Sequence, residues 1–223
     1  MMTLPYSIEM EIAGETAMWT RPDSGDCPVS YPAPTFSAVK AIFESVLWGP
    51  AVEIVPTSVE LCKPVQYHAY CTNYGGPLRR RTSNNQGHNY QLYATVLIDV
   101  CYKLYAEVLP NRRKDNLPDK ARQWDSATSS PGHAYQSIFR RRLKCGQSFS
   151  SIALGWREFT PSYFGVLRDT TNVLTDLPSI IIPSMLRQVF SKGYQCQVAY
   201  VYDHDVVINN GVLVYSRRGA GDD

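Results

Sequence analysis

The sequence has little net charge, no long apolar run and no closely spaced cysteine pair. It carries 22 Lys and Arg against 20 Asp and Glu, and a net charge of +2 does not in itself mark a nucleic-acid-binding protein. No apolar run is long enough to span a bilayer, and no basic start precedes an apolar stretch, so we expect neither a membrane span nor a signal peptide. The six cysteines form no C-x-x-C pair and no run with histidine at zinc spacing. These absences predict a protein of the reducing cytoplasm without a metal or another cofactor.

The cations that are present are clustered along the chain. Ten of the 22 fall in three short groups, which can create a local positive field on a nearly neutral protein. For any single group, a solvated surface is the commoner explanation. The groups are Arg79, Arg80 and Arg81; Arg112, Arg113 and Lys114; and Arg140, Arg141 and Arg142 with Lys144. The first is favoured for RNA or partner contact, because a loop gains nothing structurally from three adjacent arginines.

The third group ends a predicted helix and is the most informative segment of the chain. Residues 138–147 read IFRRRLKCGQ, so several cations occupy the last turns and Gly146 stops the helix. Residues 152–159 are apolar around Gly155 and predict a strand after the turn. A basic helix that leads into a glycine turn suits a phosphate backbone, because guanidinium groups and backbone N–H groups can converge there.

Hydrophobic periodicity predicts the remaining elements. Residues 6–13 alternate as a half-buried strand, and Thr35 can cap a helix that ends at Gly49 and Pro50. A second strand follows over residues 51–65. The polar, tyrosine-rich residues 66–89 predict a long protruding hairpin, and the strict alternation over residues 92–108 predicts a long, central or bent strand.

The C-terminal half completes the pattern. A second helix should open at Ser130 with Pro131 at its first position. The apolar stretches 177–190 and 197–215 predict strands, the last with a turn at Asn209, Asn210 and Gly211.

This order of elements predicts an α+β fold. We expect a ferredoxin-like or RRM-like RNA-binding domain over residues 1–160, with residues 66–89 as its hairpin, and a small, mostly β C-terminal region over residues 161–223. A sheet of this kind is covered by helices on one face and leaves the other face available for a ligand.

Several segments together resemble the CRISPR-associated Cas-five family, type I-C branch. They cover most of residues 5–160 in the order and spacing of that family, whereas the C-terminal sixty residues match loosely, through residues 210–212 (NGV). The matching segments are residues 20–22 (TRP), 30–40 (SYPAPTFSAVK), 47–51 (LWGPA), 61–65 (LCKPV), 138–142 (IFRRR), 146–149 (GQSF) and 154–159 (LGWREF).

The resemblance implies a subunit of an RNA-guided, DNA-targeting complex. Such a subunit holds the 5′ repeat-derived handle of the guide RNA beside Cas-seven-type backbone subunits and a large subunit, and it meets target DNA through the complex. The residues that we expect to contact RNA are Arg79, Arg80, Arg81, Arg140, Arg141, Lys144, Arg21 and Lys40. An RRM-like RNA-binding protein that acts alone, outside a CRISPR complex, is the alternative.

The same resemblance implies metal-independent cleavage of precursor guide RNA by an activated 2′-hydroxyl. This chemistry needs a base, an acid and a cation for the phosphorane charge. The family's tyrosine position reads Leu47 here, and its Lys-His pair falls on Ala134 and Tyr135. His133 lies two residues before the expected histidine, so His133 and Tyr135 are the candidate catalytic residues, and both a binding and a cleaving subunit stay open.

The segment Asp203-His204-Asp205 resembles a metal cluster only in composition. Three adjacent residues alternate sides of a strand and cannot all reach one ion, so we expect no metal site there.

Overall fold

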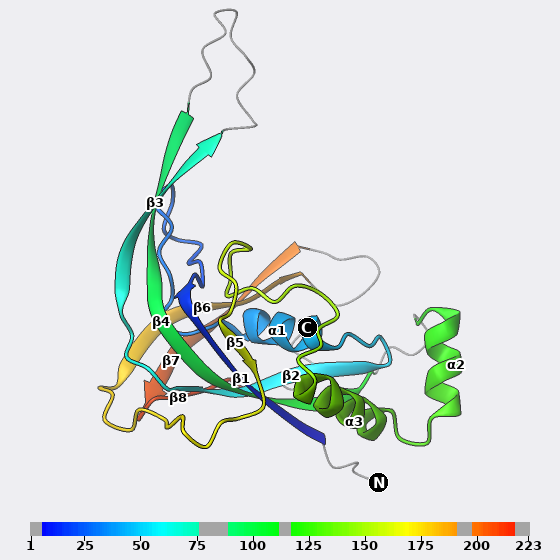
Figure 1. Ribbon diagram of the computed structural model, residues 1–223. Helices are drawn as coiled ribbons and strands as arrows, with labels where there is room; N and C mark the ends of the chain where they lie inside the picture. The colour runs from blue at the N-terminus through cyan, green and yellow to red at the C-terminus, as the bar shows by residue number, and fades with distance from the viewer. Residues whose placement is uncertain (1–5, 76–88, 112–116, 191–197, 217–223) are drawn as a thin grey trace, which may run out of the picture.

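The computed structural model describes residues 6–75, 89–111, 117–190 and 198–216, which form eight strands and three helices (Figure 1). In chain order these are β1 (Tyr6–Ala17), α1 (Phe36–Val46), β2 (Val52–Leu61), β3 (Tyr67–Gly75), β4 (Asn89–Pro110), α2 (Asp119–Ala127), α3 (Pro131–Lys144), β5 (Tyr163–Gly165), β6 (Ile180–Phe190), β7 (Val198–Asn209) and β8 (Val212–Val214).

The eight strands form one antiparallel sheet in the order β5-β1-β4-β2-β8-β7-β6, and β3 pairs with the first half of β4. The predicted α+β class is therefore confirmed. Within the described residues, no helix is both long and apolar enough to cross a membrane.

β4 is the central strand of the sheet, as its alternation predicts. Its second half pairs with β1 on one edge and β2 on the other, and its first half pairs with β3. Asp99 has a φ of 51°, a left-handed conformation within β4, between the part that pairs with β3 and the part that pairs with β2. β3 and the start of β4 flank residues 76–88 and extend away from the body (Figure 1).

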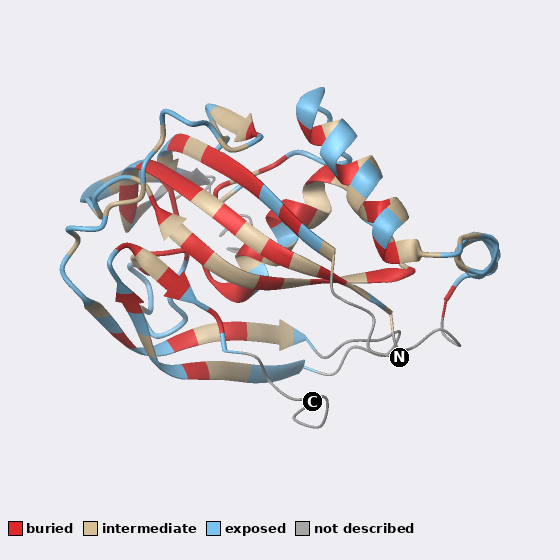
Figure 2. Ribbon diagram, turned by 90° about the horizontal axis from the view of Figure 1, so that it is seen from below, coloured by how far each residue is buried: buried red, intermediate tan, exposed pale blue. Residues whose placement is uncertain are grey.

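Helices α1 and α3 cover the apolar face of the sheet. Thr35 caps α1 as predicted, since its side chain accepts a hydrogen bond from the Ala38 N–H at 3.3 Å. Phe43 of α1 and Phe139 of α3 are both fully buried, with ring centroids 5.7 Å apart, and belong to the same buried core as the strand residue Met10. Along the strands, buried positions that face the helices alternate with more exposed positions on the other face (Figure 2).

The C-terminal strands continue the same sheet. β8 pairs with β2, and β7 and β6 follow it outward and curve back toward α1. Arg187 of β6 forms an ion pair with Asp203 at 2.9 Å, and its guanidinium stacks 3.9 Å over the Phe36 ring. The predicted turn is present, with positive φ at Asn210 and Gly211.

Two elements differ from the sequence-based expectation. Residues 152–159 form a loop and not the predicted strand, because Gly155 adopts a φ of 94° and packs directly against the backbone of Met18. The apolar side chains of Ile152, Leu154 and Phe159 anchor this loop in the core.

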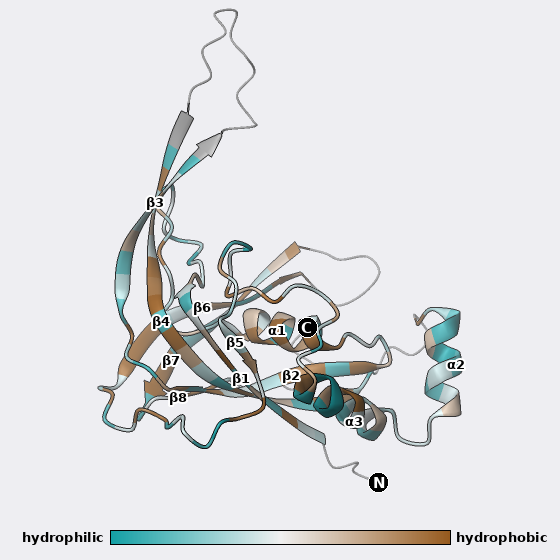
Figure 3. Cartoon of the chain, viewed as in Figure 1, coloured by the Kyte–Doolittle hydropathy of each residue, from teal (hydrophilic) through white to brown (hydrophobic). Residues whose placement is uncertain are grey.

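Helix α2 was not expected from the sequence. It is short and polar, none of its residues is buried, and it stands apart from the body (Figures 2 and 3). A nine-residue segment without an apolar stripe lacks the periodic signal that predicts a helix.

Candidate nucleic-acid interface

Helix α3 is held in the body by one face and presents cations on the other. Pro131 occupies its first turn as predicted, and Tyr135, Phe139 and Leu143 are buried. Gly146 ends the helix with a φ of 62°, where the Gly146 N–H donates to the Leu143 carbonyl and the Gln147 N–H donates to the Arg142 carbonyl. These two bonds are a Schellman motif, so the sequence-based end of the helix is correct.

The exposed face of α3 carries Arg140, Arg141 and Lys144. All three side chains are exposed, and within the described part of the chain none forms an ion pair with a carboxylate. Their charge is therefore available to a phosphate backbone, and they lie where the carbonyl end of the helix also favours cations.

The amino end of α3 packs against the start of β1. The exposed His133 makes an edge-to-face contact with Tyr6, at 5.8 Å between ring centroids. The Tyr6 hydroxyl is 3.0 Å from the Ser130 hydroxyl, and the ring of Tyr6 leaves no room for a side chain at Gly132. His133 thus has a fixed ring neighbour and remains accessible to solvent.

Tyr135 is buried, unlike His133. Its hydroxyl donates a hydrogen bond to the backbone carbonyl of Leu47, and its ring stacks on Phe139. Burial raises the pKa of Tyr135 well above its ordinary value. In this conformation, the hydroxyl would have to leave the Leu47 carbonyl before it could give a proton to RNA, so the geometry favours a structural role.

The other predicted contacts lie in different places. Lys40 on α1 is half-buried and lies 3.9 Å from Glu44, whose pKa is raised by burial. Arg21 binds Asp23 through two hydrogen bonds, at 3.1 and 2.7 Å, and lies over the Tyr31 ring. The cations on α3 are therefore gathered on one surface, while Arg21 lies in the loop between β1 and α1.

Arg79, Arg80 and Arg81 lie outside the described residues, as do Arg112, Arg113 and Lys114. Their contact with RNA stays a prediction.

The second face of the sheet carries carboxylates. Glu9 is exposed, Glu60 accepts a hydrogen bond from the Tyr105 hydroxyl at 3.0 Å, and Glu11 is completely buried. We call this the carboxylate face. Carboxylates repel RNA phosphates, so this face favours a partner that tolerates negative charge, and its availability for a ligand stays a prediction.

Part of the carboxylate face is covered by the segment between β5 and β6. Arg168 donates to Glu11 from its backbone N–H at 2.8 Å and from its guanidinium at 2.5 Å, and the Thr171 hydroxyl donates at 2.9 Å. Burial alone would raise the pKa of Glu11, but the hydrogen bonds from Arg168 and Thr171 outweigh it and lower this pKa below its ordinary value. Glu11 is therefore an ionised buried anchor for this segment.

An aromatic cluster at the root of the hairpin was not identified from the sequence. Tyr70 of β3 meets Phe159 edge-to-face at 5.4 Å, and Phe159 stacks on Trp156 at 5.6 Å. The Trp156 Nε1 donates to the Thr20 hydroxyl at 3.1 Å. Tyrosine abundance was the available signal, but only the fold brings β3 and the 152–159 loop together.

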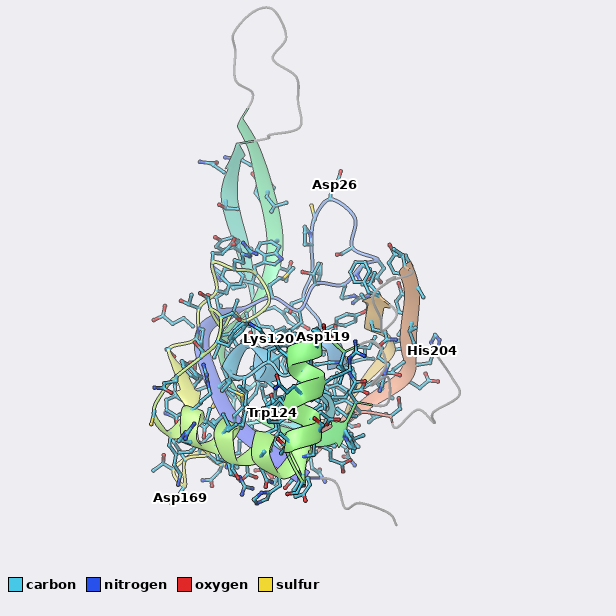
Figure 4. All side chains as sticks on the ribbon, turned by 90° about the vertical axis from the view of Figure 1, so that its right-hand side faces the viewer. Asp26, Asp119, Lys120, Trp124, Asp169 and His204 are labelled. Carbon is cyan, nitrogen blue, oxygen red and sulfur yellow. The ribbon has the colours of Figure 1, made fainter. Side chains whose placement is uncertain are left out.

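Nearby aromatic rings at the root are exposed to solvent. Tyr67 is 48% exposed and Tyr93 is 55% exposed, on paired strands of the hairpin stem. The loop that contains Asp26 rises beside this stem (Figure 4). Exposed tyrosine rings offer flat faces for nucleobases.

Among the described residues, no group of three or more His, Cys, Asp and Glu side chains is placed to hold a metal ion. His204 is exposed on β7, at the edge of the molecule (Figure 4).

Known proteins are similar to this chain in sequence and in fold. The profile of the family described as "CRISPR-associated protein (Cas_Cas5)" matches residues 7–205. A relative from Mannheimia succiniciproducens, named CRISPR pre-crRNA endoribonuclease Cas5d, is 27% identical over 177 residues, which are 73% of each chain. A Thermus thermophilus protein of the same name is 30% identical over 159 residues, which are 70% of this chain and 62% of the relative.

Two solved structures have a similar fold. A functionally uncharacterized protein from Streptococcus mutans aligns with a TM-score of 0.69 and 18% identity, covering 95% of this chain and 93% of that one. The structure of a CRISPR-associated protein aligns with a TM-score of 0.66 and 17% identity, covering 98% and 95%. The profile match over most of the chain shows that this protein belongs to the Cas5d family of CRISPR-associated proteins, type I-C.

Proposed function

We propose that this protein is the subunit of a type I-C-like CRISPR effector complex that binds the 5′ handle of the guide RNA. The observation that carries the proposal is the row of exposed cations on α3, Arg140, Arg141 and Lys144, on a helix fixed to the body by its opposite face. Phosphate contacts of this kind supply most of the affinity for a nucleic-acid backbone.

The fold also supports the proposal. The pattern of β1, α1, β2, β4 and α3 supports a ferredoxin-like or RRM-like RNA-binding domain over residues 1–160, with the β3–β4 hairpin as its protrusion. The strands of residues 161–223 form its β-rich C-terminal region. We expect the partners to be guide RNA, Cas-seven-type backbone subunits and a large subunit, with target DNA reached through the complex in the cytoplasm.

Removal of the α3 cations tests the proposal. Three exposed side chains are replaced in the variant with Arg140→Ala, Arg141→Ala and Lys144→Ala, so the fold should be retained. Affinity for a repeat-derived RNA should fall about 10–100-fold at physiological salt, and the slope of log K against log salt should fall by about 2. Filter binding across a salt series measures both quantities.

Single lysine variants supply a matched control. Lys144→Ala on α3 and Lys120→Ala on α2 each remove one exposed lysine from a helix. Only the first should weaken RNA binding. Equal affinities for the triple variant and the wild type would contradict the assignment of this surface.

Metal-independent cleavage of precursor guide RNA is the second candidate function. It is favoured by the names of the two relatives and by His133, an exposed imidazole at the amino end of α3. An imidazole in reach of the 2′-hydroxyl could act as the base, and Arg140 could neutralise phosphate charge.

The cleavage assay uses repeat RNA in EDTA. If the protein cuts, His133→Ala should slow cleavage about 10²–10⁴-fold while RNA affinity is retained. A substrate with a 2′-deoxy sugar at the cut site should resist cleavage, because it lacks the attacking hydroxyl. Absence of cleavage in the wild type would leave the binding function as the whole function, and equal cleavage by the variant would remove His133 from the mechanism.

A further inference from the structure

Two cysteine side chains face each other where β2 ends. The register that pairs Leu61 with Tyr102 continues by one step to Cys62 and Cys101, and the Cys62 N–H donates to the Cys101 carbonyl at 2.9 Å. Residues directly opposite in antiparallel strands project to the same side of the sheet. Each thiol also has a hydrogen-bond acceptor of its own: the Cys62 thiol donates to the Glu60 carbonyl at 3.9 Å, and the Cys101 thiol donates to a carboxylate oxygen of Glu11 at 3.6 Å.

This arrangement meets the spacing that a disulfide requires. Opposite residues of an antiparallel pair have Cα atoms about 4.5 or 5.5 Å apart, according to the type of pair. Disulfides accept Cα separations of about 4.4–6.8 Å. Either type of pair can therefore be bridged without movement of the strands.

The surroundings distinguish this pair from the exposed thiols Cys27, Cys71 and Cys145. Cys101 is buried and its sulfur lies 3.6 Å from a carboxylate oxygen of Glu11, whereas Cys62 is half-buried. One thiol of the pair is thus reached from solvent and the other is shielded, which favours reaction with each other over reaction with a second molecule.

The pair also lies where the body of the sheet meets the β3–β4 hairpin. Cys62 follows the last residue of β2, and Cys101 lies two residues after Asp99, where β4 changes conformation. Lys63 forms an ion pair with Asp99, and the Ile98 N–H donates to the Gln66 carbonyl at 3.0 Å. A covalent link between residues 62 and 101 would close a ring that contains the whole hairpin.

We propose that Cys62 and Cys101 form a reversible disulfide, driven by a peroxide, that fixes the root of the β3–β4 hairpin. The inference stands on the thiol geometry and does not depend on the proposed function.

The reaction balances with one peroxide for each pair. One sulfur, having lost its proton, attacks a peroxide oxygen; the S–O bond forms, the O–O bond breaks, and the leaving hydroxide takes the proton to become water. The second sulfur then attacks the sulfenic sulfur, the S–S bond forms, the S–O bond breaks, and a second water leaves with the second thiol proton. The two thiols lose two electrons, and hydrogen peroxide is reduced to two waters.

Mass spectrometry of the full-length protein tests the link. After treatment with hydrogen peroxide and alkylation of the remaining thiols, a non-reducing digest should contain one peptide pair joined through Cys62 and Cys101, and dithiothreitol should release it. Cys62→Ser and, separately, Cys101→Ala should abolish this pair. Cys71→Ser, which removes an exposed thiol of β3, should leave it intact.

Thermal unfolding gives a second readout. Closure of a loop of this length should raise the Tm of the oxidised wild type by about 5–10 °C, and dithiothreitol should reverse the rise. Cys62→Ser should show no rise. The proposal is overturned if Cys62 and Cys101 remain alkylated while the exposed cysteines oxidise, if Cys62 links to another cysteine, or if oxidation lowers the Tm of the wild type but not of Cys62→Ser.

Discussion

Helices α1 and α3 cover one face of the sheet, whereas a loop and a set of carboxylates occupy the other. On the helical face, Phe43 and Phe139 bury the apolar side of β1 and β4, and the outer surface of α3 is cationic. On the carboxylate face, Glu11 is buried beneath Arg168 and Glu9 is exposed. The stability of the helical face comes mainly from apolar burial, and that of the carboxylate face from charged hydrogen bonds.

This difference bears on where the guide RNA of the proposed function would bind. A sheet face lined by glutamates repels phosphates, while the solvent side of α3 attracts them. In this protein the helical layer and the hairpin are therefore better candidates for RNA contact than the open sheet face.

Loss of the Phe139 ring should produce the largest effect. Phe139→Ala removes a fully buried ring between α3 and α1, and we expect the free energy of unfolding to fall by about 3–5 kcal/mol. Urea unfolding measures the change. Arg140→Ala, the next residue on the same helix, should cost less than about 0.5 kcal/mol. Similar costs for the two variants would mean that α3 is not held by its apolar face.

Glu11→Gln should weaken the carboxylate face by a smaller amount. We expect a loss of about 2–3 kcal/mol, because hydrogen bonds from Arg168 and Thr171 lose their charged acceptor. The pKa of Glu11 is lower in the folded protein than its ordinary value of 4.5, so its contribution is present above that pH and is lost as the pH falls below it.

Unfolding of both proteins across a pH series measures this linkage. The difference in stability between the wild type and Glu11→Gln should be largest near neutral pH and should shrink below about pH 4.5. A difference that stays constant down to pH 3 would show that folding does not lower the pKa of Glu11.

Tyr135→Phe should lower the stability only modestly, and it distinguishes a structural role of the Tyr135 hydroxyl from a catalytic one. The variant removes only the hydroxyl that donates to the Leu47 carbonyl, so we expect a loss of about 1–1.5 kcal/mol by urea unfolding. RNA affinity should not change. If the protein cleaves RNA, cleavage by Tyr135→Phe should equal that of the wild type; a loss of more than about 100-fold would instead make Tyr135 the proton donor.

The smallest effect is expected for a cation added to the carboxylate face. Glu9→Lys changes the charge by two at an exposed position of β1, yet RNA affinity should change less than about 3-fold. Ser137→Lys adds one charge to the exposed side of α3, beside Arg140 and Arg141, and should tighten binding about 3–10-fold. Filter binding compares the two variants. The reverse order would place RNA on the carboxylate face.

Local sequence signals account for most of the elements of this fold. The alternation of β1 and β4, the Thr35 cap, Pro131 at the start of α3 and the glycine at its end each follow from short-range geometry. The 152–159 loop and α2 could not be predicted from such signals. The loop depends on a close backbone contact at Gly155, which hydrophobic periodicity does not reveal, and α2 has no apolar stripe to mark it as a helix.

The candidate site divides in the same way. The clustering of Arg140, Arg141 and Lys144 is determined by the local sequence, because they lie within two turns of one helix that ends at a glycine. Three contacts arise only from long-range packing: the burial of Tyr135 against Leu47 from the packing of α3, the aromatic cluster from β3 and the 152–159 loop, and the meeting of Cys62 with Cys101 from the pairing of β2 and β4. Contacts between residues far apart in sequence depend on strand register and helix packing, and no local pattern of side chains specifies either one.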